Sequence, residues 1–381
     1  MRSRACVAGV LFVFCGCSRT TPQGAAGPDA LIVPELRITK TDPNDLPGIF
    51  KEASDKLLRE EYKAAAEDFD RIVAVEPQGN AAVPSLYNAG IAYAGLGDLD
   101  KAASRYRASA EQDPQAPTTK IAWLRLARIY AHIERWKELE AVSGTILARQ
   151  DLTVLERIEG MGAKGLALVE QGRTDEGYDV IVKARNEIED RRLGEAGIPS
   201  VELAQVSFAL GEIRRVRSEK VKFMPVPADF GAVLEERCTG LLDAQTAYTD
   251  AMKSLDAHWS AMAGFRIGQL YQTLHRDVMI VPAPAGASTI RQKQLWEGAM
   301  RMRYRILLEK GLAMMGGTVA LGERTGESSA WVARAREAKK ELETAIATEK
   351  EALSKLPFTE EEIKTALDDL KKKNPPKPPT P

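Results

Sequence analysis

The residues in this sequence that could perform acid–base or metal chemistry are few and far apart. Two of its three histidines, His258 and His275, each have an aspartate two positions away, at Asp256 and Asp277. Imidazole and carboxylate groups together could hold a metal ion or exchange protons. Their separation of 17 residues matches no metal-ligand spacing, however, and no Glu-x-x-His motif accompanies them. We therefore interpret both histidines as residues that satisfy helix ends beside aromatic neighbours.

Other sources of catalytic chemistry are also weak. The sequence contains no Gly-x-Ser-x-Gly nucleophile motif, no phosphate loop and no dinucleotide fingerprint. Cys238 lies in an apolar helical stretch, which predicts an inert buried thiol. Acidic pairs such as Glu235 and Glu236 are typical of solvated helix faces. The sequence thus predicts a protein that is not an enzyme, with no metal, no cofactor and no small-molecule substrate. A cell-wall-remodelling enzyme that uses Asp256 or Asp277 is the alternative of another class.

The first 17 residues have the features of an export signal. Two arginines precede an apolar stretch from Ala5 to Gly16, which is too short to cross a bilayer as a helix. The stretch ends in Gly16 and Cys17, and this pattern resembles a bacterial lipobox, in which a small residue precedes the modified cysteine. The resemblance implies a lipoprotein signal peptide over residues 1–16 and a lipid on Cys17. An ordinary signal peptide is the alternative.

Several expectations follow from this assignment. Residues 17–45 are rich in Pro, Gly and Thr, which predicts a flexible tether. Ser18 after the lipidated cysteine favours the outer membrane, with the protein facing the periplasm. Removal of residues 1–16 and lipidation of Cys17 leave Cys238 as the only thiol, so we expect no internal disulfide. The near-balanced net charge of −1 argues against a nucleic-acid partner.

A repeat of 37 residues organises the first half of the chain. Tyr62, Leu99 and Trp136 share this spacing. Further sets that share it are Ala65, Ala102 and Leu139; Ala53, Gly90 and Ala127; Tyr93 and Tyr130; and Pro77 and Pro114. Self-similarity at a fixed period, within sequence of helical pattern, predicts a stacked helical repeat.

The middle copy resembles the tetratricopeptide repeat (TPR). It contains, in order, Leu86-x₂-Ala89-Gly90-x₂-Tyr93, Ala102-x₃-Tyr106 and Pro114. We expect small side chains at Gly90 and Ala102 where two helices cross, and a left-handed glycine at Gly97 in the turn between them. The resemblance implies an all-α, TPR-type helical-repeat solenoid over residues 46–198.

In such solenoids the first helix of each repeat lines a concave groove that receives a peptide or a partner helix. The register predicts a partner-binding groove that contains Tyr87, Asn88, Ile91, Leu124, Arg125, Arg128 and His132. Asn88 followed by Arg125 and Arg128 resembles the carboxylate clamp that grips the acidic end of a peptide. The chain departs from that clamp at Tyr87, where the clamp has a lysine. Tyr87 is instead a candidate aromatic anchor, and the alternative is that these polar residues are simply solvated.

The second half keeps its helical pattern without the repeat, and we expect a non-canonical, TPR-like helical-hairpin region over residues 199–356. Its predicted helices span Phe230–Lys253, Ala257–His275, 288 to about 315 and 328 to about 355. Thr359 and Glu362 predict a capping box that opens a last short helix to Lys373, followed by a Pro-rich tail, within residues 357–381.

Two family resemblances refine the functional expectation. Strings such as His258-Trp259-Ser260-Ala261-Met262 resemble the TPR lipoproteins of the gliding-motility envelope complexes of predatory soil bacteria. The combination of lipobox and repeats is also similar to the repeat lipoprotein of the outer-membrane barrel-assembly machinery, which lacks so long a C-terminal half. Both resemblances imply a lipid-anchored scaffold that binds envelope proteins through the concave surface of its repeats.

Overall fold

The computed structural model describes residues 45–114, 117–195 and 197–373, and within these it contains helices and no strand. The predicted signal peptide, Cys17, nearly all of the tether and the tail from Asn374 lie outside the described residues. The all-α prediction is confirmed. The helices are α1 (Leu46–Leu58), α2 (Tyr62–Val75), α3 (Ala82–Gly95), α4 (Leu99–Gln112), α5 (Pro117–His132), α6 (Trp136–Leu147), α7 (Val154–Glu170), α8 (Thr174–Asp190), α9 (Val201–Glu219), α10 (Phe230–Met252), α11 (Ala257–Met279), α12 (Ile290–Thr325), α13 (Ala330–Ser354) and α14 (Glu360–Lys373).

The described chain forms two compact units. The first, the repeat unit, contains residues 45–209 together with 253–256, and the second, the C-terminal unit, contains residues 210–252 and 257–373. The division falls inside α9, whereas the sequence pattern ends the repeats at residue 198. Across the described residues, no helix combines the length and the apolar character that crossing a bilayer requires.

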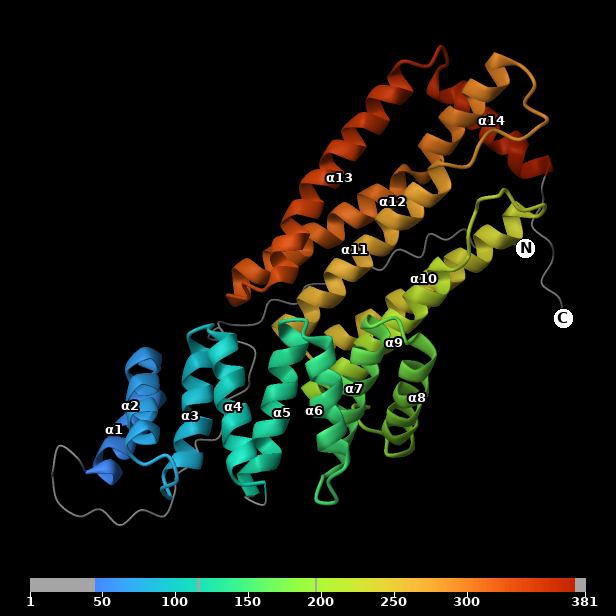
Figure 1. Cartoon of the computed structure of the whole chain (residues 1–381). Coiled ribbons are helices and arrows are strands. Elements are labelled where there is room, and N and C mark those ends of the chain that lie inside the picture. The colour runs from blue at the N-terminus through green and yellow to red at the C-terminus, as the bar shows by residue number, and fades with distance from the viewer. Residues whose placement is uncertain (1–44, 115–116, 196, 374–381) are drawn as a thin grey trace. The chain divides into compact units, whose positions relative to one another are not determined.

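The repeat unit is a series of helix pairs, α1–α2 through α7–α8, which follow one another in chain order (Figure 1). The second helix of each of the first three pairs begins at Tyr62, Leu99 and Trp136. The 37-residue period of the sequence is therefore a period of the structure. Gly97 in the turn of the second pair has a φ of 77°, which confirms the predicted left-handed glycine.

Small residues at equivalent positions let the helices of each pair approach closely. Ala53, Gly90 and Ala127 are all buried. A side chain placed at Gly90 would meet the ring of Tyr106 at 2.8 Å, so this glycine makes room for the tyrosine rather than for Ala102. A larger residue there would displace the ring.

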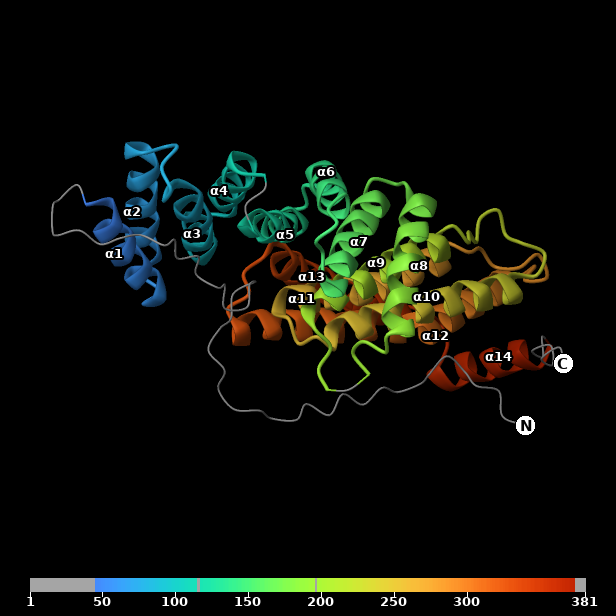
Figure 2. The ribbon, with the colours of Figure 1, turned by 90° about the horizontal axis from the view of Figure 1, so that it is seen from below.

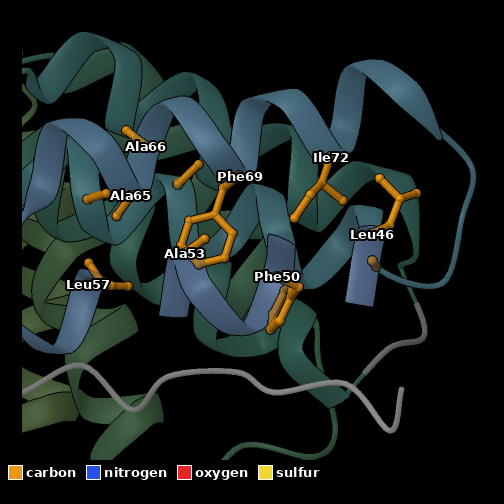
Figure 3. Packing of buried hydrophobic residues seen from close by; sticks show 11 residues of the cluster. Leu46, Phe50, Ala53, Leu57, Ala65, Ala66, Phe69 and Ile72 are labelled. Atoms are coloured by element: carbon orange, nitrogen blue, oxygen red, sulfur yellow. The ribbon is translucent and has the colours of Figure 1, made fainter. Parts of the chain in front are cut away.

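The first pair shows how each repeat fills its core. Phe50 of α1 and Phe69 of α2 pack edge to face with ring centroids 5.4 Å apart, among buried aliphatic side chains that include Leu46, Leu57 and Ile72 (Figure 3). Such aromatic pairs contribute about 0.5–1.5 kcal/mol beyond the area that they bury.

Neighbouring repeats are joined by hydrogen bonds that recur at the same period. The Gln112 side chain donates to the carbonyl oxygen of Pro77 at 2.6 Å, and Arg149, 37 residues later, donates to that of Pro114 at 3.4 Å. Each bond joins the C-terminal end of a second helix to the loop in front of its repeat.

A second recurring contact involves tyrosines. The Tyr93 hydroxyl donates to Asp70 at 2.7 Å, and at the equivalent position Arg107 donates to the Tyr130 hydroxyl at 2.8 Å. Asp70 also accepts two hydrogen bonds from Arg105. Burial, followed by the hydrogen bond to Asp70, raises the pKa of Tyr93 to about 12. Both repeats keep the tyrosine, but its partner is the acidic Asp70 in one and the basic Arg107 in the next. The contact therefore recurs in the same place with a partner of opposite charge.

The C-terminal unit is built mainly on α11, α12 and α13, long helices that lie alongside one another (Figures 1 and 2). Small residues again permit close packing: side chains placed at Gly264 and Gly268 would meet Thr318 at 2.4 Å and Met315 at 2.7 Å. The predicted end of α12 near residue 315 is wrong. The helix continues through Gly316 and Gly317 to Thr325, because packing on α11 and α13 outweighs the low helix propensity of glycine.

The last helix begins as the sequence predicts. The Thr359 hydroxyl accepts from the backbone N–H of Glu362 at 3.2 Å, and the Glu362 carboxylate accepts from the N–H of Thr359 at 2.9 Å. This reciprocal pair is a capping box, which satisfies two of the unpaired N–H groups at a helix start.

Candidate partner-binding surface

The predicted groove residues lie on α3 and α5, the first helices of the second and third pairs. Three of them, Tyr87, Asn88 and Leu124, are buried. The other four, Ile91, Arg125, Arg128 and His132, are half-buried and offer part of their surface to solvent.

Tyr87 is held within its own repeat. Its side chain is 1% exposed, and its ring packs edge to face on Tyr106 of α4 with centroids 5.4 Å apart. An anchor residue has to present its ring to the partner, so an anchoring role requires Tyr87 to become uncovered first. That role stays a prediction. The repeat pattern does not reveal the burial, because it specifies which helix face points to the groove and not what covers that face.

Arg128 is engaged by carboxylates of the chain itself. Its guanidinium lies 2.5 Å from Glu159 of α7 and 3.3 Å from Glu202 of α9. Glu159 is buried, which strengthens the attraction because little water screens it. A carboxylate at the end of a bound peptide would have to compete with both glutamates for this arginine. The sequence could not indicate these partners, since they are 31 and 74 positions away.

The charge of this cluster follows from its members. Arg128, Glu159 and Glu202 together carry one more negative than positive charge, and all three belong to first helices or to the helix that follows the last pair. These three residues together are therefore better matched to a cationic side chain than to a carboxylate.

The structure does not bring together the residues that suggested acid–base or metal chemistry. His258 lies at the start of α11 and His275 near its end, about 25 Å apart at 1.5 Å per residue. His258 packs edge to face on Trp259 and its Nδ1 lies 3.4 Å from the Glu327 carboxylate. Asp277 pairs with Arg237 and with Arg276, each at 3.5 Å.

His275 is a buried imidazole of the C-terminal unit. Burial lowers its pKa, the nearby Glu349 carboxylate opposes that shift, and Arg301 adds to it. Arg301 itself donates to Glu349 at 2.8 Å, which occupies this carboxylate. One residue from each of α11, α12 and α13 thus meets at this point.

Sequence reasoning missed a fully buried charged site around Glu212. The Glu212 carboxylate of α9 is fully buried and accepts from Arg215 and Tyr248, both at 2.6 Å, while Arg266 of α11 lies 2.7 Å away. Burial opposes ionisation of Glu212, but Arg266 and Arg215 outweigh it and hold its pKa well below its usual value. Only the Glu212–Arg215 spacing on one helix was visible in the sequence.

Cys238 also differs from its prediction. Its side chain is half-buried rather than buried. The helix α10 turns this face away from the core, whereas the neighbouring Arg237 points inward and is fully buried.

Comparisons with known proteins give similarity of fold only. No protein-family model matches the chain, and no curated protein matches it by sequence. A TPR protein from Parabacteroides merdae aligns over 78% of this chain and 98% of its own, with 12% identity and a TM-score of 0.42. A kinesin light chain with nearly identical TPR-like repeats from Podospora anserina aligns over 55% and 100%, with 13% identity and a TM-score of 0.37.

Proposed function

We propose that this protein is a non-catalytic scaffold that binds protein partners through the first helices of its repeats while a lipid on Cys17 holds it at the outer membrane, facing the periplasm. The observation that supports the scaffold role most directly is the recurrence of inter-repeat contacts at the period of the sequence. Arg149 repeats the contact of Gln112 at an interval of 37 residues, and the second helices of the first three pairs begin at the same interval, so these pairs stack with one period. A surface built in this way can hold an extended partner segment.

The charge of the cluster around Arg128 suggests the chemistry of the partner. Glu159 and Glu202 surround Arg128, which favours a partner segment that places a lysine or arginine there. This differs from the acidic peptide end that the carboxylate-clamp resemblance implies.

The finer assignment within the scaffold class draws on the sequence. The lipobox at Cys17, the tether of residues 17–45 and the strings around His258 support a role in a gliding-motility envelope complex. The barrel-assembly machinery is the second version of the same role, and lipobox and repeats support it equally.

The test is affinity capture of the tagged full-length protein from cross-linked envelopes, with mass spectrometry of the captured partners. Two charge-reversal variants make it specific to the surface. Glu202→Lys changes a half-buried acidic residue of the cluster around Arg128, and Glu111→Lys makes the same charge change at an exposed position of α4. We expect Glu202→Lys to lose partners that wild type and Glu111→Lys retain.

Three outcomes decide the proposal. Motility or barrel-assembly components among the lost partners identify the version of the scaffold. Equal capture by both variants contradicts binding through the groove. Capture no greater than that of a Cys17→Ser control, with no partner of any kind, contradicts the scaffold role and favours the enzyme alternative.

A further inference from the structure

Two adjacent glycines stand in the middle of α12 with no other helix packed on them. Gly316 is half-buried and Gly317 is exposed, and a side chain placed at either would meet no atom from another part of the described chain within 4 Å. Glycine is among the least favourable residues for a helix interior. At Gly311 that cost is offset by close packing on α11, but nothing within the described chain offsets it at Gly316 and Gly317.

The exposed face of α12 around these glycines is short of charge. Between residues 306 and 320 its exposed positions are Ile306, Glu309, Ala313, Gly317 and Ala320, at intervals of three or four residues. This spacing places them on one side of the helix, and Ile306 is 41% exposed. A solvent-facing side of a helix ordinarily carries charged and polar residues. The composition here is instead that of a side against which another helix packs.

The same side of α12 already receives a helix nearer its start. Gly298 and Gly316 are 18 residues apart, which is five turns, so they lie on one line along α12. Gly298 is buried, and a side chain placed there would meet Leu356 at 2.9 Å and Ile363 of α14 at 3.1 Å. A glycine on this line therefore makes room for a helix at one position, and the equivalent room at Gly316 is open.

Residues at equal distances on either side of the two glycines complement each other. Each pair lies as far before Gly316 as after Gly317. The pairs are Glu309 and Arg324, Lys310 and Glu323, and Ala313 and Ala320. If two α12 helices ran antiparallel and crossed at the glycines, the members of each pair would lie at the same level on opposite helices. Opposite charges would then meet at both ends, and small residues at the centre.

The geometry of a helix singles out one of the two charged pairs. At 3.6 residues per turn, Glu309 and Arg324 lie closer to the middle of the glycine face than Lys310 and Glu323 do. The first pair is thus the one within reach across the contact. Each end of the contact contains two acidic and two basic residues from the two pairs, so these residues sum to zero charge. A second copy therefore matches this face better than a uniformly acidic or basic segment.

We propose that this face of α12 docks on the same face of a second copy of the chain, with the two helices antiparallel and crossing at Gly316 and Gly317. A two-fold axis passes through the crossing, so every contact occurs twice. The absence of side chains at the crossing allows the two backbones to approach closely, and Glu309 of each copy pairs with Arg324 of the other. The contact is independent of the partner-binding surface of the repeats.

The first test is the oligomeric state of residues 18–381, which retain every described helix and lack Cys17. Sedimentation equilibrium should show monomers and dimers in a concentration-dependent balance. Gly317→Leu should raise the dissociation constant of the dimer at least about tenfold, because the added side chain holds the helices apart. Urea unfolding at dilutions where wild type is monomeric should show no loss of stability in this variant. Ala347→Leu, at an exposed alanine of α13, is the matched control and should leave dimerisation unchanged.

A charge exchange tests the predicted ion pair. Glu309→Lys and Arg324→Glu should each weaken the dimer, because each places like charges opposite one another. The double variant Glu309→Lys, Arg324→Glu exchanges the two charges and should restore the dissociation constant to within about threefold of wild type. A double variant that is as weak as the sum of the single losses contradicts the pairing.

Introduced cysteines test the orientation of the helices. In a Cys238→Ser background, chains with Ala313→Cys are mixed with chains with Ala320→Cys and mildly oxidised. We expect a disulfide-linked dimer in the mixture and little in either chain alone, because each position faces the other and not itself. Equal cross-linking by Ala313→Cys alone overturns the antiparallel contact.

Two further results would overturn the proposal. One is wild type that stays monomeric up to about 1 mM, and the other is a dimer that Gly317→Leu leaves intact. If Gly317→Leu instead loses a captured protein and no dimer forms, the face binds a helix of another protein and not a second copy.

Discussion

Gly268 of α11 and Gly311 of α12 lie in direct backbone contact. A side chain placed at Gly311 would meet the carbonyl oxygen of Gly268 at 3.2 Å, and one placed at Gly268 would meet the carbonyl oxygen of Gly311 at 3.3 Å. The two helices can therefore approach only where neither has a side chain. This contact fixes the spacing on which the packing of α11, α12 and α13 depends.

Substitution of Gly311 tests that spacing. We expect Gly311→Leu to lower the free energy of unfolding by about 1–3 kcal/mol, because the helices must separate. Gly317 on the same helix has no atom within 4 Å of an added side chain. Gly317→Leu should therefore raise stability by about 0.5–1 kcal/mol through helix propensity. Urea unfolding of both variants measures the difference, and equal effects would contradict a close contact at Gly311.

The buried carboxylate of Glu212 should be essential to the C-terminal unit. Glu212→Gln leaves Arg215 and Arg266 without their counter-charge, so we expect a loss of about 3–5 kcal/mol. Glu219 pairs with the same Arg215 at 3.0 Å but is partly exposed. Glu219→Gln should cost less than about 1 kcal/mol. Thermal unfolding of the two variants compares them, and similar losses would mean that burial of Glu212 adds nothing.

Acid should remove the contribution of Glu212. Its pKa in the folded protein lies below that of the unfolded chain, so the unfolded chain binds the proton first. The stabilisation is fully present above the unfolded pKa of about 4.3 and is lost as the pH falls below it. Unfolding free energies measured from pH 5 to pH 3 should decline less steeply in Glu212→Gln than in wild type.

His275 should give a separate pH dependence at milder acidity. Burial lowers its pKa, so the folded protein favours the neutral imidazole while the unfolded chain takes up a proton near pH 6.5. Stability is then lost as the pH falls below about 6.5. His275→Leu removes the titrating group, and its stability should change less than that of wild type between pH 7 and pH 5. The unfolding free energies of both proteins are measured by denaturant titration at these pH values. Equal losses of unfolding free energy in wild type and His275→Leu would exclude this role.

We expect the Tyr87 side chain to stabilise the fold. Truncation of a buried aromatic ring costs about 3–5 kcal/mol, and we expect this loss in Tyr87→Ala. Tyr87→Phe keeps the edge-to-face contact with Tyr106 and should cost less than about 1.5 kcal/mol. Chemical denaturation compares the pair. A small loss in Tyr87→Ala would indicate that the ring is free to meet a partner, as the groove prediction requires.

The sequence by itself determined the repeat and its register. Apolar and small residues at an interval of 37 place Ala53, Gly90 and Ala127 in equivalent buried positions, because local helix pairing depends on residues that are close in the chain. Turn and cap positions such as Gly97 and Thr359 were equally legible, since a left-handed residue or a capping box is a property of a few consecutive residues.

Only the tertiary structure decided which polar residues are engaged. Arg128 has the right type and position for a clamp, but Glu159 and Glu202 reach it from other helices. In the sequence, Glu212 is one acidic residue among many. The structure brings Tyr248 of α10 and Arg266 of α11 to its carboxylate. Charge pairing and burial depend on the distances between elements remote in the chain, and those distances are set by packing rather than by any local pattern.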